Sequence, residues 1–502
     1  MSNNTTKTAN KSANKSAKKT AKSSARTSDG IAGFFELSER KSSVRQEIRG
    51  GLVTFFAMAY ILVVNPSILI AAAGAGGAEN VTPASIAAGT ALVGGLMTIL
   101  MGLVANFPLA LAAGMGLNAM VSFTLVLGPF GLSFGEAMGL IFWEGVVITL
   151  LVVTGFREAV FNAVPSQLKV AISVGIGLFI ALVGLINAGV VRPGGTPVQL
   201  GIGGSFAGWP MVVFLVGFVV ILVLYIRKVQ AAILIGIVVS SVLAVILQAI
   251  LKIPLMTDQT GKVVNETGWT KNVPALQGSP VQLPDFATFG QIDFFGAFTK
   301  LPVISVLLLI FSLMLADFFD TMGTMVGVGA AGGLLDEKGN PPRTFQILLI
   351  DSLAAMAGGL GGVSSNTSYV ESTSGVGAGA RTGLSSVVVG LCFLLSMFFA
   401  PLVELVPAEA SSTALVFVGF LMMTQVADID WKNAENAIPA FLTIAMMPFS
   451  YSITAGIGFG CVAFIIMKLA RGKLKEIHPL MWVVGLLFVV YFALGPIQAL
   501  IS

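Results

Sequence analysis

Apolar runs of about 20 residues recur along almost the whole chain, separated by short polar stretches. A helix of that length crosses the hydrocarbon core of a bilayer. The runs form two sets of seven on either side of a long polar stretch, 252–300, followed by one more at 479–500. The first set covers 51–73, 86–104, 109–127, 136–154, 167–188, 209–226 and 231–251, and the second covers 301–327, 343–362, 369–380, 383–402, 411–426, 436–450 and 451–469. The pattern predicts an all-α polytopic membrane protein with 14 spans. Whether 479–500 also spans is left open.

Composition agrees with this prediction and narrows the function classes. Of the 502 residues, 55% are hydrophobic and 10% charged, whereas soluble domains carry roughly 25% charged residues. With two cysteines and one histidine, the chain offers neither a disulfide framework nor a metal site, so no cofactor is expected. No Walker-type phosphate loop is present, which argues against ATP as the energy source.

Basic residues mark one side of the membrane. The first 30 residues contain seven Lys or Arg and a single acid, Asp29. We predict a disordered cytoplasmic tail over 1–33 that contacts membrane lipid but not nucleic acid, because it lacks aromatic residues for base stacking. Cations recur in every second loop, as the positive-inside rule requires of the cytoplasmic side of a cell-membrane protein: Arg157, Arg227, Lys228, Lys338, Arg343, Arg381, Lys432, Lys468, Arg471, Lys473 and Lys475.

An odd-numbered repeat places its second copy upside down, which is the inverted-repeat design of many transporters. The third segment of each set contains a helix-breaking stretch, 114–118 in the first and 361–368 in the second. Non-helical backbone at that depth is tolerated where it is buried in protein or lines a cavity. The sequence therefore predicts a mid-membrane site where the two breaks meet.

Acidic residues within the spans supply the candidate chemistry. Asp317, Thr321 and Thr324 share one helical face, and Asp320 is offset from Asp317 by about 60°. Glu371 begins the short helix after the second break. Carboxylates can accept hydrogen bonds from the ring N–H and amino groups of a purine. The predicted substrate-binding residues are Asp317, Glu371, Asn118, Asp320, Thr321 and Ser372.

Other polar residues in the spans are expected to have structural roles. Glu144 and Asp351 lie in ordinary apolar helices and are interpreted as interhelical hydrogen-bonders. Asn65, before Pro66, is expected to cap a helix. Buried carboxylates can cycle between protonated and charged forms near neutral pH, so Asp317 and Glu371 are also the predicted proton-coupling residues; sodium remains an alternative coupling ion.

Several longer motifs resemble the AzgA-like purine permeases of the nucleobase–cation symporter family. They are FFELSERKSSVRQEIRGGLVTFFAMAYILVVNP at 34–66, GMGLNA at 114–119, ADFFDTMGT at 316–324 and SSNTSYVESTSGVGAGARTGL at 364–384. The resemblance implies a permease rather than an enzyme, with adenine, guanine or hypoxanthine as substrate and a homodimer as its oligomeric state. It points to Asp317 and Glu371 as the substrate-site acids, with Asp320 and Asn118 also involved. At Thr321 the uracil and xanthine branches often carry a histidine.

The same resemblance implies a uracil-permease-like fold in which a core domain moves against a gate domain. The expected divisions are a tail at 1–33, core at 34–154, gate at 155–251, an extracytoplasmic loop at 252–300, core at 301–402 and gate at 403–502. An anion exchanger or channel of the same fold is the main alternative, although acids at the site would repel an anion. An aspartyl protease is disfavoured, since Asp317 and Asp320 lie on one helix and no GxGD pattern is present.

Overall fold

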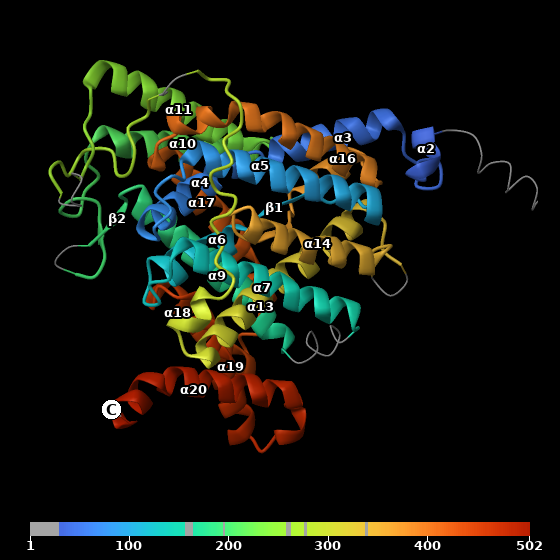
Figure 1. The fold of residues 1–502 in the computed structure, drawn as a ribbon, viewed down its shortest axis with the longest axis vertical. Helices are drawn as coiled ribbons and strands as arrows, with labels where there is room; N and C mark the ends of the chain where they lie inside the picture. Colours follow the sequence, from blue (N-terminus) through green and yellow to red (C-terminus); the bar gives the residue numbers. More distant parts are fainter. Residues whose placement is uncertain are drawn as a thin grey trace, which may run out of the picture.

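The computed structural model describes residues 30–155, 164–193, 196–257, 263–275, 279–336 and 340–501 (Figure 1). Most of the predicted basic tail, and the loop cations Arg157 and Lys338, lie outside these ranges. The described part begins with a short helix, α2 (Gly30–Phe34).

Helices follow the predicted segments closely in both halves. The first half contains α3 (Val44–Met58), α4 (Ile61–Ala75), α5 (Pro83–Leu100), η1 (Met101–Ala105), β1 (Leu111–Ala113), α6 (Met115–Ala119), η2 (Met120–Val126), α7 (Phe134–Val153), α9 (Ser166–Asn187), β2 (Val191–Arg192), β3 (Gln199–Leu200), α10 (Trp209–Ile226) and α11 (Ala232–Leu251). The second half contains α12 (Gly296–Lys300), α13 (Val303–Gly332), α14 (Thr344–Leu360), β4 (Asn366–Ser368), α15 (Ser372–Gly377), α16 (Gly383–Ser396), η3 (Met397–Leu405), α17 (Ala408–Met423), η4 (Thr424–Asp428), α18 (Ala434–Phe449), α19 (Ile453–Ala470), η5 (Leu474–Glu476) and α20 (Pro479–Ile501).

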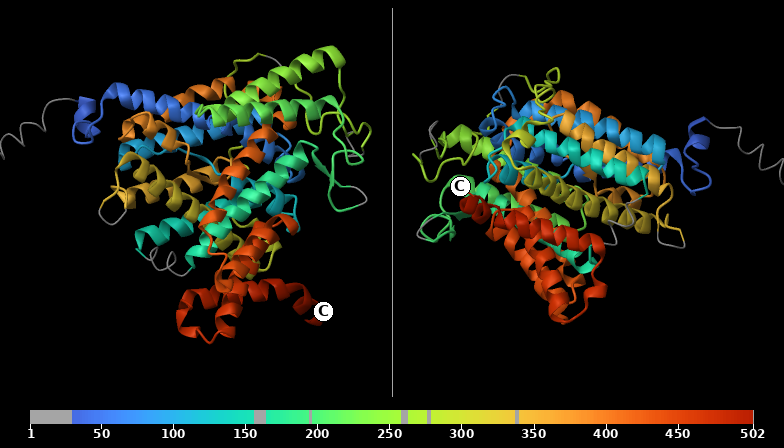
Figure 2. Two further views of the ribbon diagram at one scale, coloured as in Figure 1. Left: turned by 180° about the vertical axis from the view of Figure 1, so that it is seen from behind. Right: turned by 60° about the horizontal axis from the view of Figure 1, so that its bottom comes forward.

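Ten helical segments within the described ranges are long and apolar enough to cross a membrane. The remaining predicted spans are shorter apolar helices, or are broken by the strands β1 and β4. The protein is therefore an all-helical, multi-pass membrane protein. Its last helix, α20, packs against α19 and α13 and lies at one end of the molecule in Figure 1 and in the left view of Figure 2.

The helices pack as two groups. In the first group, α3, α5, α7, α13, α14, α15 and α16 contact one another. In the second group, α17 packs on α9, α10 and α11, and α18 packs on α9 and α19. The groups meet where α9 contacts α6 and α13, and where α4 contacts α17. Segments from both halves of the sequence contribute to each group, so neither half folds as a separate unit.

Two non-helical breaks meet in the first group. β1 pairs antiparallel with β4, with Leu111 opposite Ser368 and Ala113 opposite Asn366. The second break was predicted correctly, but the first lies earlier than the predicted 114–118, because Gly114 caps α6 and the residues after it are helical. The first break is the non-helical segment 106–114, which includes β1. The strands end after about three residues, and α6 and α15 continue from them. Gly362, in the second break, has φ +65° and its backbone lies against Thr288, so a side chain would fit there only with strain.

Hydroxyl groups from neighbouring helices satisfy the backbone around the first break. The Thr98 hydroxyl accepts a hydrogen bond from the Leu111 N–H at 2.9 Å, and the Ser386 hydroxyl accepts one from the Leu109 N–H at 2.9 Å. The Ser372 hydroxyl accepts a bond from the Ala110 N–H at 3.0 Å. Unpaired backbone groups are costly where water is excluded. The polar residues of α5, α15 and α16 thus make an irregular chain possible inside an apolar protein.

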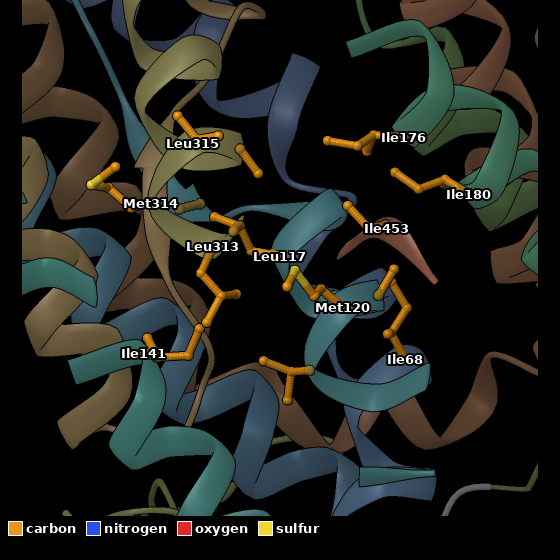
Figure 3. Close-up of a cluster of buried hydrophobic side chains, with 14 of the residues drawn as sticks. Ile68, Leu117, Met120, Ile141, Ile176, Ile180, Leu313, Met314, Leu315 and Ile453 are labelled. Atoms are coloured by element: carbon orange, nitrogen blue, oxygen red, sulfur yellow. The ribbon is translucent and has the colours of Figure 1, made fainter. Parts of the chain in front are cut away.

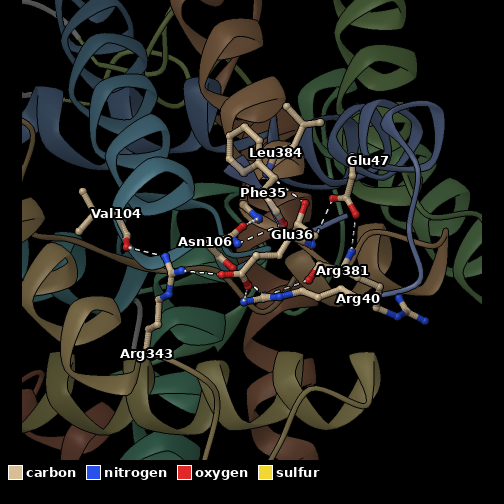
Figure 4. A network of polar contacts seen from close by, with 11 residues as sticks. Phe35, Glu36, Arg40, Glu47, Val104, Asn106, Arg343, Arg381 and Leu384 are labelled. Atoms are coloured by element: carbon tan, nitrogen blue, oxygen red, sulfur yellow. Dashed lines mark hydrogen bonds and ion pairs between the residues drawn. The ribbon is translucent and has the colours of Figure 1, made fainter. Parts of the chain in front are cut away.

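The chain entering the first group is held by a polar network, which we call the clasp (Figure 4). It consists of Glu36, Arg40, Glu47, Asn106, Arg343 and Arg381. Arg40 donates to the Asn106 carbonyl at 2.7 Å, and Arg343 forms an ion pair with Glu36 at 2.9 Å. The carboxylate of Glu47 accepts bonds from the backbone N–H groups of Arg381 and Thr382, at 2.8 and 3.2 Å.

Candidate substrate site

Helix α13 carries its two aspartates on different faces. Asp317 is 0% exposed, and Thr321 and Thr324 on the same face are also buried, at 1% and 6% exposure. Asp320, rotated by about 60° around the helix axis, is exposed. Of the two aspartates on α13, only Asp320 therefore has a carboxyl group that reaches accessible space.

Glu371 lies opposite Asp320 at the start of α15. It is partly exposed, and the Tyr60 hydroxyl donates a hydrogen bond of 2.6 Å to its Oε1. Tyr60 is fully buried between α3 and α4, which fixes the direction of the carboxyl group. The Tyr369 hydroxyl donates to the Ala113 carbonyl at 2.6 Å and ties the second break to the first. Asp320 interacts electrostatically with Glu371, Tyr60 and Tyr369. The four side chains form one cluster beside the paired breaks.

Accessible space reaches this cluster from one end of the molecule. On α13, exposed positions follow Asp320 at Gly327, Ala330 and Ala331, toward the end of the helix near the clasp. Val370, beside Glu371, is 55% exposed. In the opposite direction, residues 312–318 of α13 are all buried. The exposed positions of α13 thus continue from Asp320 toward the end of the helix near the clasp.

The other side of the cluster is closed by apolar packing between the two groups (Figure 3). Leu117 and Met120 follow the first break, and Ile176 and Ile180 of α9 lie across from them. Gly116 lies so close to Ile176 that an added Cβ would stand 2.7 Å from the isoleucine methyl. Close backbone approach of this kind requires glycine. The two helix groups are therefore in tight apolar contact at this place.

The remaining predicted site residues are enclosed by protein. Thr321 donates to Asp351 Oδ2 at 2.7 Å, and its hydroxyl lies 2.8 Å from that of Thr367. The hydroxyl of Ser372 is engaged with the first break, as described above. Asn118, on α6, is fully buried, and neither of its side-chain polar atoms has a hydrogen-bond partner. The structure thus brings Asp320 and Glu371 together at accessible space and places the other four behind them.

One interpretation of the supporting residues is corrected by the structure. Asn65 does not cap a helix: it lies within α4, and its amide donates to Thr90 Oγ1 at 2.7 Å and to the Val363 carbonyl at 3.2 Å, linking α4 to α5 and the second break. Glu144 of α7 interacts with Asp317 of α13 and with Ser365, so it does link helices, although among the described residues neither of its carboxyl oxygens has a partner in ideal hydrogen-bond geometry. Asp351 does have the predicted role, accepting from Thr321 and from Ser368 at 2.8 Å.

Tyr60 was missed by reasoning from the sequence. The sequence did contain one indication: the chain has only five tyrosines, and two of them, Tyr60 and Tyr369, lie at the site. A tyrosine within an apolar run is ordinarily an interfacial residue. Only the break between α3 and α4 places its hydroxyl beside Glu371.

Known proteins match this chain over nearly its whole length. A model of the permease family matches residues 45–493. The chain belongs to the permease family. It is 38% identical to the adenine permease AdeP of Escherichia coli over 91% of this chain and 94% of that protein. It is 39% identical to the guanine/hypoxanthine permease PbuG of Bacillus subtilis, over 91% and 98% of the two chains. The similarity to AzgA-like permeases is confirmed, and this permease is a membrane transporter rather than an enzyme.

Solved structures share the fold at low sequence identity. The transmembrane domain of the cyanobacterial bicarbonate transporter BicA superposes with a TM-score of 0.54 at 15% identity, covering 82% of this permease and 97% of that chain. The overall structure of SLC26A9 gives a TM-score of 0.57 at 12% identity, covering 86% and 67%. These likenesses establish the transporter fold, in which seven-plus-seven inverted repeats are found, and carry no information about the substrate.

Proposed function

We propose that this permease is a proton-coupled symporter that carries a purine nucleobase, namely adenine, guanine or hypoxanthine, into the cell. The observation that carries the proposal is the pairing of Asp320, which is exposed, with the partly exposed Glu371 beside the two breaks. Relatives named as adenine and guanine/hypoxanthine permeases support the substrate class.

The chemistry of the cluster suits a neutral heterocycle that both donates and accepts hydrogen bonds. Asp320 and Glu371 accept from ring N–H and amino groups, and hydrogen bonds to charged acceptors are stronger than neutral ones. Tyr60 holds the Glu371 carboxyl group in place. We assign substrate contact to these two acids, and to Asn118 once the two helix groups close on the ligand. Thr321 and Ser372 then support the site from behind through the bonds they already make.

The transport cycle we propose is movement of the first helix group, as the core domain, against the second, as the gate domain. Fourteen segments span the membrane, with the clasp end cytoplasmic, consistent with the basic residues on that side. The arrangement described here then opens inward. Breaking the apolar contact around Met120 and Ile176 on one side, and closing the Asp320 side, would give the outward-open form.

An anion carrier is disfavoured by the same acids. Two carboxyl groups at the accessible end of the site repel an anion unless both are neutralised. The bicarbonate and anion transporters of similar fold are too distant in sequence to weigh against this argument.

Uptake of labelled adenine, guanine and hypoxanthine into transport-deficient cells tests the proposal. We expect accumulation of at least one purine, its loss on addition of a protonophore, and little change on replacing sodium or adding sulfate. Uptake that depends on sodium and resists the protonophore would contradict proton coupling. Sulfate transport without purine transport would contradict the substrate class.

A further inference from the structure

A second pair of acids lies about one turn of α13 away from the substrate cluster, which consists of Asp320, Glu371, Tyr60 and Tyr369. Glu144 of α7 and Asp317 of α13 are both 0% exposed. Their carboxyl groups interact directly with each other. None of their four carboxyl oxygens has a hydrogen-bond partner that meets normal geometry. Within the described ranges, neither acid takes part in an ion pair.

The surroundings of the pair are polar but supply no positive charge. Asp351 of α14 is the third acid in contact range, and its oxygens already accept from Thr321 and Ser368. On the second break, Ser365 and Asn366 are fully buried with their side-chain polar atoms unpartnered. Among the described residues, the other charged groups on α7, α13 and the helices packed against them stand at helix ends or in the substrate cluster, namely Glu136, Lys169, Lys300, Lys468, Asp320 and Glu371.

Electrostatics restricts the charge that this pair can hold. Two adjacent carboxylates in a water-excluded site repel strongly, and each also loses its hydration. At least one of the two must therefore be protonated, as in other carboxyl pairs that share a proton. A neutral structural role would be served equally well by amides or by partnered acids such as Asp351. Unpartnered acids are instead suited to gaining and losing a proton.

We propose that Glu144 and Asp317 together carry the coupled proton, at a site separate from the purine-contacting acids Asp320 and Glu371. One carboxylate oxygen of the pair takes up a proton from solution on the loading side, forming an O–H bond. That bond breaks when the proton is released on the other side, and no electrons are transferred.

Coupling to the purine follows from the position of the pair. Asp317 and Asp320 are separated by about 4.5 Å along the axis of α13, and both interact with Asp351. A charge on either site therefore changes the electrostatic potential at the other. Movement of α13 when the groups rearrange would change the access of both sites together.

The inference rests on the proposed function for its transport readouts, and purified protein in proteoliposomes separates the two. For one proton per purine, a gradient of about one pH unit supports about tenfold accumulation. We expect Glu144→Gln to lose that accumulation and the accompanying proton uptake, measured with an internal pH dye, while purine counterflow without a gradient persists. The matched control is Glu79→Gln, at an exposed loop acid, which should retain all three.

The possible outcomes distinguish a failure of the proton site from a failure of the proposed function. Gradient-driven accumulation retained in Glu144→Gln would overturn the proton site while leaving the symporter intact. Accumulation driven by sodium in the wild type, and lost in the variant, would make the pair a cation site and would also overturn it. If the wild type transports no purine, the proposed function fails, and infrared spectroscopy of the purified protein still tests the pair. We expect a protonated-carboxyl band that Glu144→Gln and Asp317→Asn each remove or shift; a band unchanged in both variants would refute the shared proton.

Discussion

The clasp and the mid-membrane acids are both buried polar clusters, but they are built in opposite ways. In the clasp, each oxygen of Glu47 accepts a backbone N–H, and Asn106 bonds through both ends of its amide, to the Phe35 carbonyl and the Gly383 N–H. At mid-membrane, Glu144, Asp317 and Asn118 are equally buried and have no such partners. A satisfied network stabilises one arrangement. An unsatisfied one retains capacity for a ligand or a proton, and we interpret the difference as a division between structure and transport.

The largest expected effect is on transport, at the acids of the substrate cluster. Asp320→Asn or Glu371→Gln removes a charged acceptor for the purine, worth about 2–3 kcal/mol or roughly 30- to 150-fold in affinity. We expect uptake of labelled purine to fall by that factor, with normal amounts of protein in the membrane. Asp317→Asn is the comparison, since it should alter gradient-driven accumulation more than purine binding. Equal loss of binding in Asp317→Asn, with Asp320→Asn unaffected, would reverse our assignment of the two faces of α13.

In the clasp we expect the opposite result, a loss of stability without a loss of purine binding. Glu47→Ala leaves the buried N–H groups of Arg381 and Thr382 without an acceptor and should destabilise the protein by about 2–4 kcal/mol. Thermal unfolding of detergent-solubilised protein, followed by the purine affinity of the fraction that remains folded, measures both properties. We expect a lower unfolding midpoint with little change in affinity. A large affinity loss without destabilisation would remove the distinction between the two clusters.

Tyr60→Phe tests whether the Glu371 carboxyl group must be held in place. Loss of one hydrogen bond to a charged acceptor corresponds to about 1–2 kcal/mol, or roughly 5- to 30-fold weaker purine binding. Tyr369→Phe is the matched control, because its hydroxyl donates to a backbone carbonyl instead. That variant should mainly lower stability. The idea fails if the two variants affect binding equally.

The smallest effect is expected at the exposed edge of the clasp. Arg343 and Glu36 form an ion pair at 2.9 Å with side chains 38% and 33% exposed. Such pairs contribute about 0.2–1 kcal/mol and are screened by salt. Arg343→Gln should therefore shift the unfolding midpoint slightly at low salt and not at high salt. A shift as large as that of Glu47→Ala would show that the pair is more than a surface contact.

Hydrophobic periodicity and length determined most of the architecture from the sequence alone. The runs at 209–226 and 231–251 correspond to α10 and α11 almost residue for residue, because a bilayer span is defined by local apolar length. The second break was visible because Gly, Ser and Asn interrupt an apolar run there, whereas the first was predicted at 114–118 and lies just before it, in the apolar Leu111–Ala113. The motifs at 316–324 and 364–384 were enough to indicate the family.

Only the tertiary structure determined which polar groups are buried and which partners they contact. Asp317 and Asp320 differ by about one helical turn, and only the packing of α7 and β4 against α13 encloses the first and leaves the second exposed. The partner of Glu371, Tyr60, lies 311 positions away in the sequence, and the partners of Asn65 lie on two other elements, α5 and the second break. The reason is physical: burial in a span is set locally by the bilayer, whereas satisfaction of a buried polar atom depends on long-range contacts that no local pattern encodes.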